Sequence, residues 1–265
     1  MSVIAFGSAK AAPGVTTALL ACAAAWPADR RVVVAELDPD GGDVAAWYGL
    51  RGEPGLLSYA AQGRRSLHPD TILDHTQPLP GPGGVRVLVG PPAPEQAAAG
   101  LGALLGAGLD DRLGGLAGVD VLVDCGRLRP GSPLTGLLPA VTTTVLVARP
   151  TLAEIAHLRP RVAALRASRP ALLLIGEAPY DAEEVAEALA APVLGVLADD
   201  ARGAAALAGR AASRHLRRSA LARSAVAIAE RLTATGADEP KPQLAGEPVA
   251  APVAPPPVNG RVMRW

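Results

Sequence analysis

A loop of small residues near the start of the chain has the composition of an anion-binding turn. Residues 7–17 read GSAKAAPGVTT and lie between the apolar run VIAF and an apolar, alanine-rich stretch. Small side chains let the backbone curl, so that successive N–H groups and the N-terminus of the next helix face one anion. The Thr16 hydroxyl stands where such loops bind Mg²⁺, and Lys10 adds a positive charge. The sequence therefore predicts a phosphate site in this loop.

The loop departs from the common phosphate-loop pattern G-x-x-x-x-G-K-[ST] at two positions. Ala9 stands at the first glycine, and Val15 stands at the lysine that normally reaches the terminal phosphates. A lysine makes charge-assisted hydrogen bonds to phosphate of ~1.5–3 kcal/mol each, so its loss predicts weak binding and slow or absent hydrolysis. The alternative is a plain strand-to-helix connection in which Thr16 or Thr17 caps the helix.

Two carboxylates follow apolar segments elsewhere in the first half of the chain. Asp38 comes after the run RVVVAEL, and Asp124 ends the run VDVLVD. Because open α/β sheets bind ligands at the carboxyl ends of their strands, both carboxylates are expected beside the loop. There Asp38 can orient water or hold Mg²⁺, and Asp124 can hold Mg²⁺ through water. The alternative for the first segment is an acidic turn in which Asp43 caps the next helix.

These segments, taken in order, resemble the MinD/ParA family of deviant Walker A P-loop ATPases. The loop is similar to K-G-G-x-G-K-[ST]-T, which opens with a signature lysine. Residues 36–57 resemble the D-x-D-P-x-G switch I region with its L-G and P-G-L elements, and VDVLVD followed by Cys125 and Gly126 resembles the Walker B strand and the start of switch II. The resemblance continues through TTVLVARP and APVLGVLADD to about residue 234, and is nearest to the CpaE-like branch.

The resemblance implies binding of ATP and Mg²⁺ by a degenerate P-loop. It gives catalytic roles to Asp38 and to Lys10, since the family's signature lysine reaches the partner's phosphates across a nucleotide-sandwich dimer. It gives the metal to Thr16, Asp38 and Asp124, and nucleotide contact to Lys10, Ala11, Ala12, Pro13, Gly14, Val15, Thr16 and Thr17. Gly176 and Glu177 stand where the family has an adenine-reading Asn, and neither offers the paired donor and acceptor of an amide.

Short apolar, β-branched runs alternate with alanine- and leucine-rich stretches along the chain, a pattern typical of βαβ units around a buried parallel sheet. We expect strands at 3–6, 31–37, 85–89, 119–124, 143–147, 171–175 and 192–196. We expect helices near 16–25, 94–105, 152–167, 182–189, 201–208 and 219–234. The predicted fold class is α/β, with a doubly wound, mostly parallel twisted sheet flanked by helices.

Composition excludes a disordered chain and a chain-wide field for polyanions. The 265 residues are 49% hydrophobic and 19% charged, and Lys+Arg 25 balance Asp+Glu 25. Cys22 and Cys125 lack metal or redox spacing and are expected as buried thiols. Apolar runs fall short of the ~20 residues that span a bilayer. We expect a cytoplasmic protein, attached to membrane or nucleoid only through partners.

The two ends of the chain are expected to differ in order. Residues 1–235 form the predicted MinD/ParA-like domain, and the Pro- and Ala-rich residues 236–265 form a predicted disordered tail. The tail ends in RVMRW, which is either a docking peptide or an inert terminus.

Arginines gather near the last predicted helices and have two interpretations. They either form a solvated helix face or bind DNA phosphates without sequence preference, with Arg214, Arg217 and Arg218 as the contacts. In the final helix, a stripe at helical spacing is expected to pack in the core and comprises Leu221, Ala225, Ile228 and Leu232.

The leading hypothesis is a nucleotide-dependent homodimeric switch that positions or assists a pilus, secretion or partitioning machine through a protein partner. One alternative is a scaffold that keeps the fold, has lost ATPase function and acts through protein contacts. The other is a DNA-binding partitioning protein, for which the arginines are the support.

Overall fold

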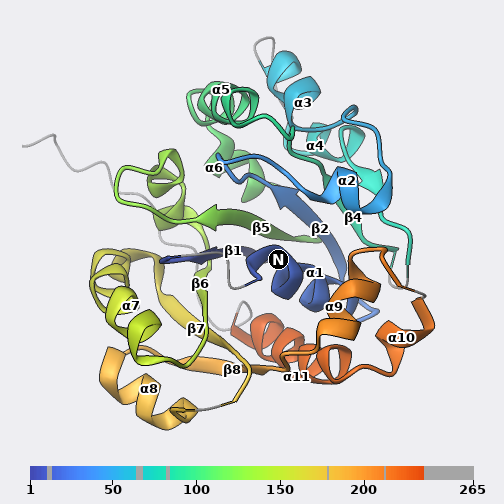
Figure 1. The fold of residues 1–265 in the computed structure, drawn as a ribbon. Coiled ribbons are helices and arrows are strands. Elements are labelled where there is room, and N and C mark those ends of the chain that lie inside the picture. The colour runs from blue at the N-terminus through green and yellow to red at the C-terminus, as the bar shows by residue number, and fades with distance from the viewer. Residues whose placement is uncertain (11–13, 64–67, 82–83, 178, 212, 236–265) are drawn as a thin grey trace, which may run out of the picture.

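Eight strands form one sheet in the order β3-β4-β2-β5-β1-β6-β7-β8 (Figure 1). The computed structural model describes residues 1–10, 14–63, 68–81, 84–177, 179–211 and 213–235. β3 runs antiparallel to β4, and the other neighbouring strands are parallel. The strands are β1 Val3–Ser8, β2 Arg31–Glu36, β3 Gln77–Pro78, β4 Arg86–Leu88, β5 Val119–Arg127, β6 Thr143–Ala148, β7 Pro170–Ile175 and β8 Val193–Leu197.

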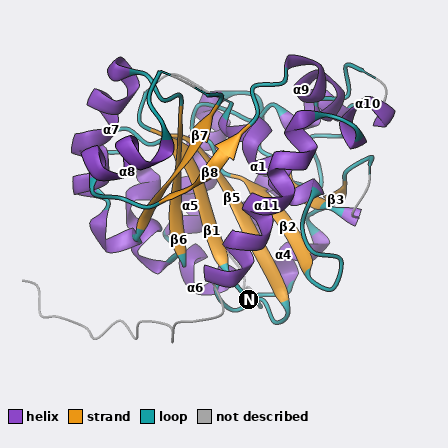
Figure 2. Ribbon diagram, turned by 90° about the horizontal axis from the view of Figure 1, so that it is seen from below, coloured by secondary structure: helices purple, strands orange, loops and turns teal. Residues whose placement is uncertain are grey.

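Helices cover both faces of this sheet (Figure 2). One face packs against α3 Leu56–Gly63, α4 Thr71–Asp74, α5 Pro94–Leu105, α6 Leu109–Leu113, α7 Leu152–Ala164 and α8 Ala182–Leu189. The other packs against α1 Val15–Ala24, α2 Val44–Tyr48, α9 Ala201–Leu207, α10 Ser213–Arg217 and α11 Ala220–Thr235. Three short 3-10 turns complete the first face: Pro133–Gly136, Leu138–Ala140 and Arg166–Ser168.

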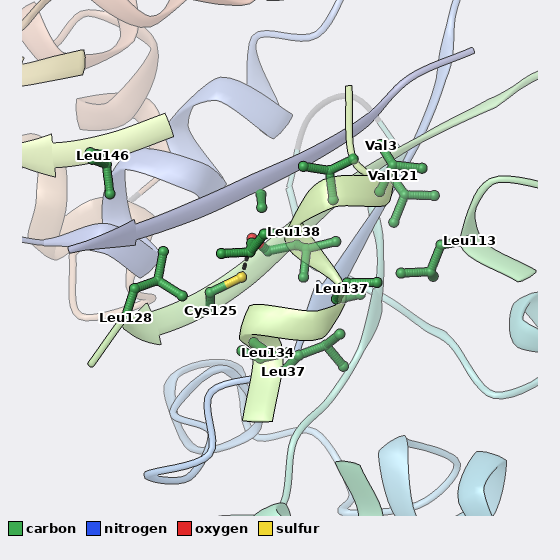
Figure 3. Close-up of a cluster of buried hydrophobic side chains, with 14 of the residues drawn as sticks. Val3, Leu37, Leu113, Val121, Cys125, Leu128, Leu134, Leu137, Leu138 and Leu146 are labelled. Atoms are coloured by element: carbon green, nitrogen blue, oxygen red, sulfur yellow. Dashed lines mark hydrogen bonds between the residues drawn. The ribbon is translucent and has the colours of Figure 1, made fainter. Parts of the chain in front are cut away.

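Alternation along the strands supplies the two cores. In β5, Val123 and Cys125 point into the first core and Leu122 into the second. Figure 3 shows part of the first core, where the turn after β5 brings Leu134 and Leu138 against Cys125. Cys22 and Cys125 are both buried thiols, as predicted, and burial raises the pKa of Cys22 to about 12.

The predicted fold class is confirmed, and every predicted strand and helix is present with ends that differ by at most three residues. The largest errors are of three residues. α7 ends at Ala164 rather than at residue 167, and β5 continues past Asp124 to Arg127, because β1 extends alongside it and Ser8 pairs with Arg127. The elements that the sequence analysis missed are short: β3, α2, α3, α4, α6 and α10. Apart from α3, which has eight residues like the predicted α8, they offer too few residues for a period to be recognised.

Of the predictions for the C-terminal part of the chain, the structure describes the final helix and not the tail. The predicted stripe of α11 is buried, as expected for core packing. The predicted tail, residues 236–265, lies outside the described residues. Within the described ranges, no helix is both long and apolar enough to cross a membrane.

Candidate functional site

The carboxyl ends of β1, β2 and β5 meet at one edge of the sheet, beside the start of α1. β5 lies between the other two strands, and Glu36 of β2 is in register with Asp124 of β5. Just past β2, Leu37 N donates to Asp124 O at 2.9 Å. Gly14 precedes α1 with φ of 96°, a left-handed conformation that glycine adopts without strain. The described part of the predicted loop and both predicted carboxylates therefore lie at the same edge.

Asp124 is the buried centre of this edge. It is only 1% exposed and hydrogen-bonds the Thr16 side chain, while its Oδ1 accepts from Gly126 N at 2.9 Å. Burial raises the pKa of Asp124 to about 6, and the charges of Asp38 and Asp43 act in the same direction. Thr16 is therefore directed at a carboxylate. The alternative in which Thr16 or Thr17 caps α1 is wrong, because Gly14 is the N-cap and no side chain caps it.

Asp38 lies over the backbone of the strand that carries Asp124. A Cβ placed on Gly126 would lie 1.9 Å from Asp38 Oδ2, so the carboxylate uses the space that glycine leaves. Asp38 Oδ1 accepts from Asp40 N at 2.8 Å, and burial raises the pKa of Asp38 above its ordinary value. Asp38, Asp124 and the Thr16 hydroxyl thus supply hard oxygen ligands of the type Mg²⁺ prefers.

These side chains do not form a complete metal cage. Within the described ranges, no group of three or more acidic, histidine or cysteine side chains could hold a metal ion. Mg²⁺ keeps several waters and usually combines one or two carboxylates with phosphate oxygens, so the oxygen set fits an ion that arrives with a phosphate ligand.

Lys10 is the one cation predicted for the loop, and Val15 stands at the usual lysine position. Val15 is 4% exposed and packs in the core, so its position gives no charge to the edge. Lys10 Nζ lies 2.9 Å from His157 Nε2 on α7. Thr17 lies in the first turn of α1 and is partly exposed. The predicted contacts Ala11, Ala12 and Pro13 lie outside the described residues.

Glu36 is a site residue whose role the sequence analysis missed. Its carboxylate is 2% exposed and accepts three backbone N–H groups: Asp43 at 2.7 Å, Val44 at 3.0 Å and Gly90 at 2.8 Å. Asp43 is the N-cap residue of α2, as the alternative has it, but its side chain makes no capping hydrogen bond, and Glu36 accepts from Asp43 N and Val44 N instead. Burial raises the pKa of Glu36 to about 7. An acid at the end of an apolar strand was the available signal.

A groove of about 500 Å³ opens beside the loop that follows β2 and carries Asp38 and Asp40. Pro39, Pro94 and Pro133 contribute to its walls, and Arg129 forms an ion pair with Asp40 at its rim. Both ends of this pair are about half exposed, at 48% and 52%.

The predicted DNA contacts lie in and just after α10, which packs on the opposite face of the sheet from α5. Arg217 and Arg218 are exposed, and the side chain of Arg214 lies outside what the structure describes. Arg218 also lines a pocket of about 350 Å³ together with Arg202, His215 and Asp200.

Comparisons with known proteins agree with this architecture. No protein-family model and no curated protein sequence matches the chain. A ParA family ATPase from Chlorobium tepidum matches in structure with TM-score 0.69 and 17% identity, over 87% of this chain and 98% of that one. MinD from Pyrococcus horikoshii, complexed with Mg-ADP, matches with TM-score 0.67 and 17% identity, over 89% and 97%. The MinC:MinD complex of Aquifex aeolicus matches with TM-score 0.64 and 13% identity, over 91% and 98%.

At these identities the likeness shows the fold. The chain has the fold of the MinD/ParA P-loop ATPases, and its carboxylate-lined edge is the one that carries the predicted phosphate loop.

Proposed function

We propose that this protein is a MinD/ParA-like switch that binds a magnesium nucleotide, forms a homodimer and positions or assists a cellular machine. The observation that carries the proposal is the hydrogen bond between Thr16 and the buried Asp124. It joins a hydroxyl in the first turn of α1 to a carboxylate of β5, which is the oxygen pair that a phosphate-bound Mg²⁺ requires. When bound, Mg²⁺ would offset the charge of the phosphates.

Each residue of the proposed site has a defined task. Thr16 binds the ion through its hydroxyl, Asp124 holds the ion's waters, and Asp38 orients water from above Gly126. Lys10 would act after leaving His157, by reaching the phosphates bound to the second protomer. The raised pKa values of Asp38 and Asp124 fit this proposal, because an unmatched buried carboxylate is stabilised by an arriving cation.

We propose slow or absent hydrolysis on the basis of Val15. A P-loop lysine stabilises the charge that develops in phosphoryl transfer, and Val15 is buried in the core instead. Residues 1–235 would form the switch, with 236–265 as a separate tail. The machine is of the pilus, secretion or partitioning kind, and MinD in complex with MinC supports recognition of a protein partner.

Val15 also supports a second candidate, a scaffold without nucleotide. Its burial leaves the described part of the edge rich in carboxylates, which repel phosphate unless a metal intervenes.

The exposed Arg217 and Arg218 support a DNA-binding role. A DNA shift that weakens with salt and disappears in Arg217→Glu plus Arg218→Glu is expected for that role, and no binding at low salt excludes it.

Calorimetric titration of Mg·ATP into the full chain tests the switch. We expect micromolar binding that Thr16→Ala weakens by about tenfold or more, because a charge-assisted contact is lost. Lys10→Ala should also weaken it where a dimer forms. Thr233→Ala is the matched control, since the Thr233 hydroxyl donates to Glu230 O within α11. A folded sample that shows no binding up to millimolar ATP contradicts the switch and favours the scaffold.

A further inference from the structure

The groove beside the loop that follows β2 has walls of proline rings. Pro39 comes from that loop, Pro94 begins α5, and Pro130 and Pro133 come from the turn after β5. Ala98, one turn further along α5, also lines it. Pyrrolidine rings pack well against aromatic rings, as in the recognition of proline-rich peptides. The walls therefore suit an aromatic side chain.

Hydrogen bonds already hold these walls together. Gly42 N donates to Pro91 O at 2.9 Å, which ties the loop after β2 to the segment before α5. Arg129 donates to the Asp40 carboxylate and so links the same loop to the turn after β5. Ser132 N donates to Arg129 O at 3.0 Å within that turn. A groove whose walls are already ordered takes up an occupant at a low entropic cost.

The polar groups of the groove favour a cationic occupant. Its described lining carries two exposed acids, Asp40 and Glu95, against one arginine, Arg129. Arg129 pairs with Asp40, whereas no described residue forms an ion pair with Glu95. Ser132 Oγ is buried without a hydrogen-bond partner among the described residues, an unfavourable state that a polar group of an occupant can relieve.

The chain itself carries a segment of complementary chemistry. Residues 261–265 read RVMRW and lie outside the described residues. Trp265 offers an indole ring, and Arg261 and Arg264 are the only charged side chains after Glu247. The segment thus combines an aromatic ring with two positive charges, which are the two features that the groove suits.

Two other pockets suit this segment less. The pocket of about 350 Å³ is lined by Arg202, His215 and Arg218, and its arginines repel those of the segment. A pocket between α1, α9 and α10 holds about 50 Å³, which is room for only a few water molecules. The comparison favours the proline-lined groove.

We propose that residues 261–265 dock in this groove of their own chain, with the Trp265 indole on the proline rings and the arginines toward Glu95 and Asp40. The docking needs no nucleotide, so it goes beyond the proposed function. The docked segment joins the loop that carries Asp38 to the turn after β5. A partner protein that uses the same groove has to displace it.

The connecting segment is long enough for this docking. α11 ends at Thr235, and the 25 residues 236–260 precede Arg261. Fully extended, they span up to about 80 Å, whereas a domain of this size is about 45 Å across. Length therefore permits docking at many places on the surface, and the prolines and acids of the groove select this one.

Cross-linking in the full chain tests the docking. Ala98→Cys plus Met263→Cys places one thiol in the groove and one in the segment, while burial raises the pKa values of Cys22 and Cys125 and keeps both unreactive. The matched control, Ala188→Cys plus Met263→Cys, moves the first thiol to an exposed alanine of α8. With a short bis-maleimide we expect the groove pair to link about tenfold or more faster, since docking raises the effective concentration of the segment.

Two further variants examine the contacts themselves. In the groove pair, Trp265→Ser should slow linking to the control rate because the indole is lost. Glu95→Lys should slow it severalfold, because it replaces an attraction for the arginines with a repulsion. Ala98, Ala188 and Glu95 are exposed, so these variants should fold, and thermal melting checks this.

The outcomes decide both the docking and its occupant. Equal rates in the groove pair and the control overturn the proposal, as does a groove rate that Trp265→Ser leaves unchanged. In a mixture of isotope-labelled and unlabelled protein, links within one chain support it. Links that join labelled to unlabelled chains assign the groove to a second copy and overturn it. Linking is measured without nucleotide, so its failure is distinct from failure of the switch to bind Mg·ATP.

Discussion

Asp120 and Asp124 lie on the same face of β5, at opposite ends of α1, and meet opposite environments. Both are buried, at 2% and 1% exposure. Asp120 accepts from Arg30 Nε at 2.7 Å and Trp26 Nε1 at 3.0 Å, beyond the C-terminus of α1. Asp124 bonds Thr16 in the first turn of α1.

The difference between them is a cation. Burial alone would raise the pKa of Asp120, but hydrogen bonds from Arg30 and Trp26 outweigh it and leave the pKa below its ordinary value. At Asp124 burial prevails, and neighbouring carboxylates add to it. β5 therefore carries a buried ion pair, Asp120 with Arg30, toward its amino end. Toward its carboxyl end it carries Asp124, a buried carboxylate with no cationic partner. A buried carboxylate that lacks a cationic partner is a candidate for a ligand site.

The largest expected effect on stability comes from removing the Asp120 carboxylate. Asp120→Ala leaves buried donors of Trp26 and Ser2 without their acceptor and should lower the free energy of unfolding by about 3 kcal/mol. Urea denaturation measures this. Asp29→Ala, an exposed neighbour, should change it by less than about 0.5 kcal/mol. A loss at Asp120 no larger than at Asp29 would contradict the contrast.

The buried acids at the carboxyl ends of β2 and β5 should make the ligand-free protein less stable as pH rises from about 5 to about 8. Glu36, with a pKa of about 7, and Asp124, with a pKa of about 6, hold protons in the folded state that they release when unfolded. Stability is thus fully present below their unfolded values and is lost as pH rises through the folded ones.

Asp124→Asn isolates the contribution of one group. It should raise stability at pH 8 by about 1–2 kcal/mol and reduce the slope, while it abolishes Mg·ATP binding. Asp120 adds nothing to this slope, because its lowered pKa lies below the range. Thermal melts of the wild type and the variant at several pH values provide the measurement. Parallel curves that differ by a constant would refute the assignment.

Val15→Lys should give Asp124 a cationic neighbour, as Arg30 is for Asp120. We expect about tenfold tighter Mg·ATP binding, worth ~1.4 kcal/mol, and a lower pKa of Asp124. Val15→Met is the control, because it adds length without charge. Unchanged affinity in the lysine variant would mean that position 15 does not face the phosphates.

The smallest expected effect belongs to Asp43. Its side chain caps nothing, and its charge adds to the raised pKa values of Asp38 and Asp124. Asp43→Ala should therefore change the free energy of unfolding by less than about 0.5 kcal/mol. Glu36→Ala is the comparison, and should cost more because three N–H groups lose their acceptor. Equal effects would return the capping role to Asp43.

The sequence was sufficient for the long elements and for the identity of the edge. Apolar periods in β1, β2 and β5 predicted the sheet, and strand ends predicted where Asp38 and Asp124 would meet. Side-chain contacts were not predictable, because they depend on residues distant in the chain. Glu36 accepts a hydrogen bond from Gly90 N, which lies just beyond β4. Arg149 donates a hydrogen bond to Asp199, fifty residues later in the chain.

Glu36 has a consequence for the entropy of binding. Its carboxylate closes residues 36–44 into a ring, since it accepts from Asp43 N and Val44 N while its own backbone belongs to β2. A ring whose ends are tied explores far fewer conformations than an open loop. The segment that carries Asp38 has therefore already lost much of its freedom, and a ligand that meets Asp38 needs to order little further chain.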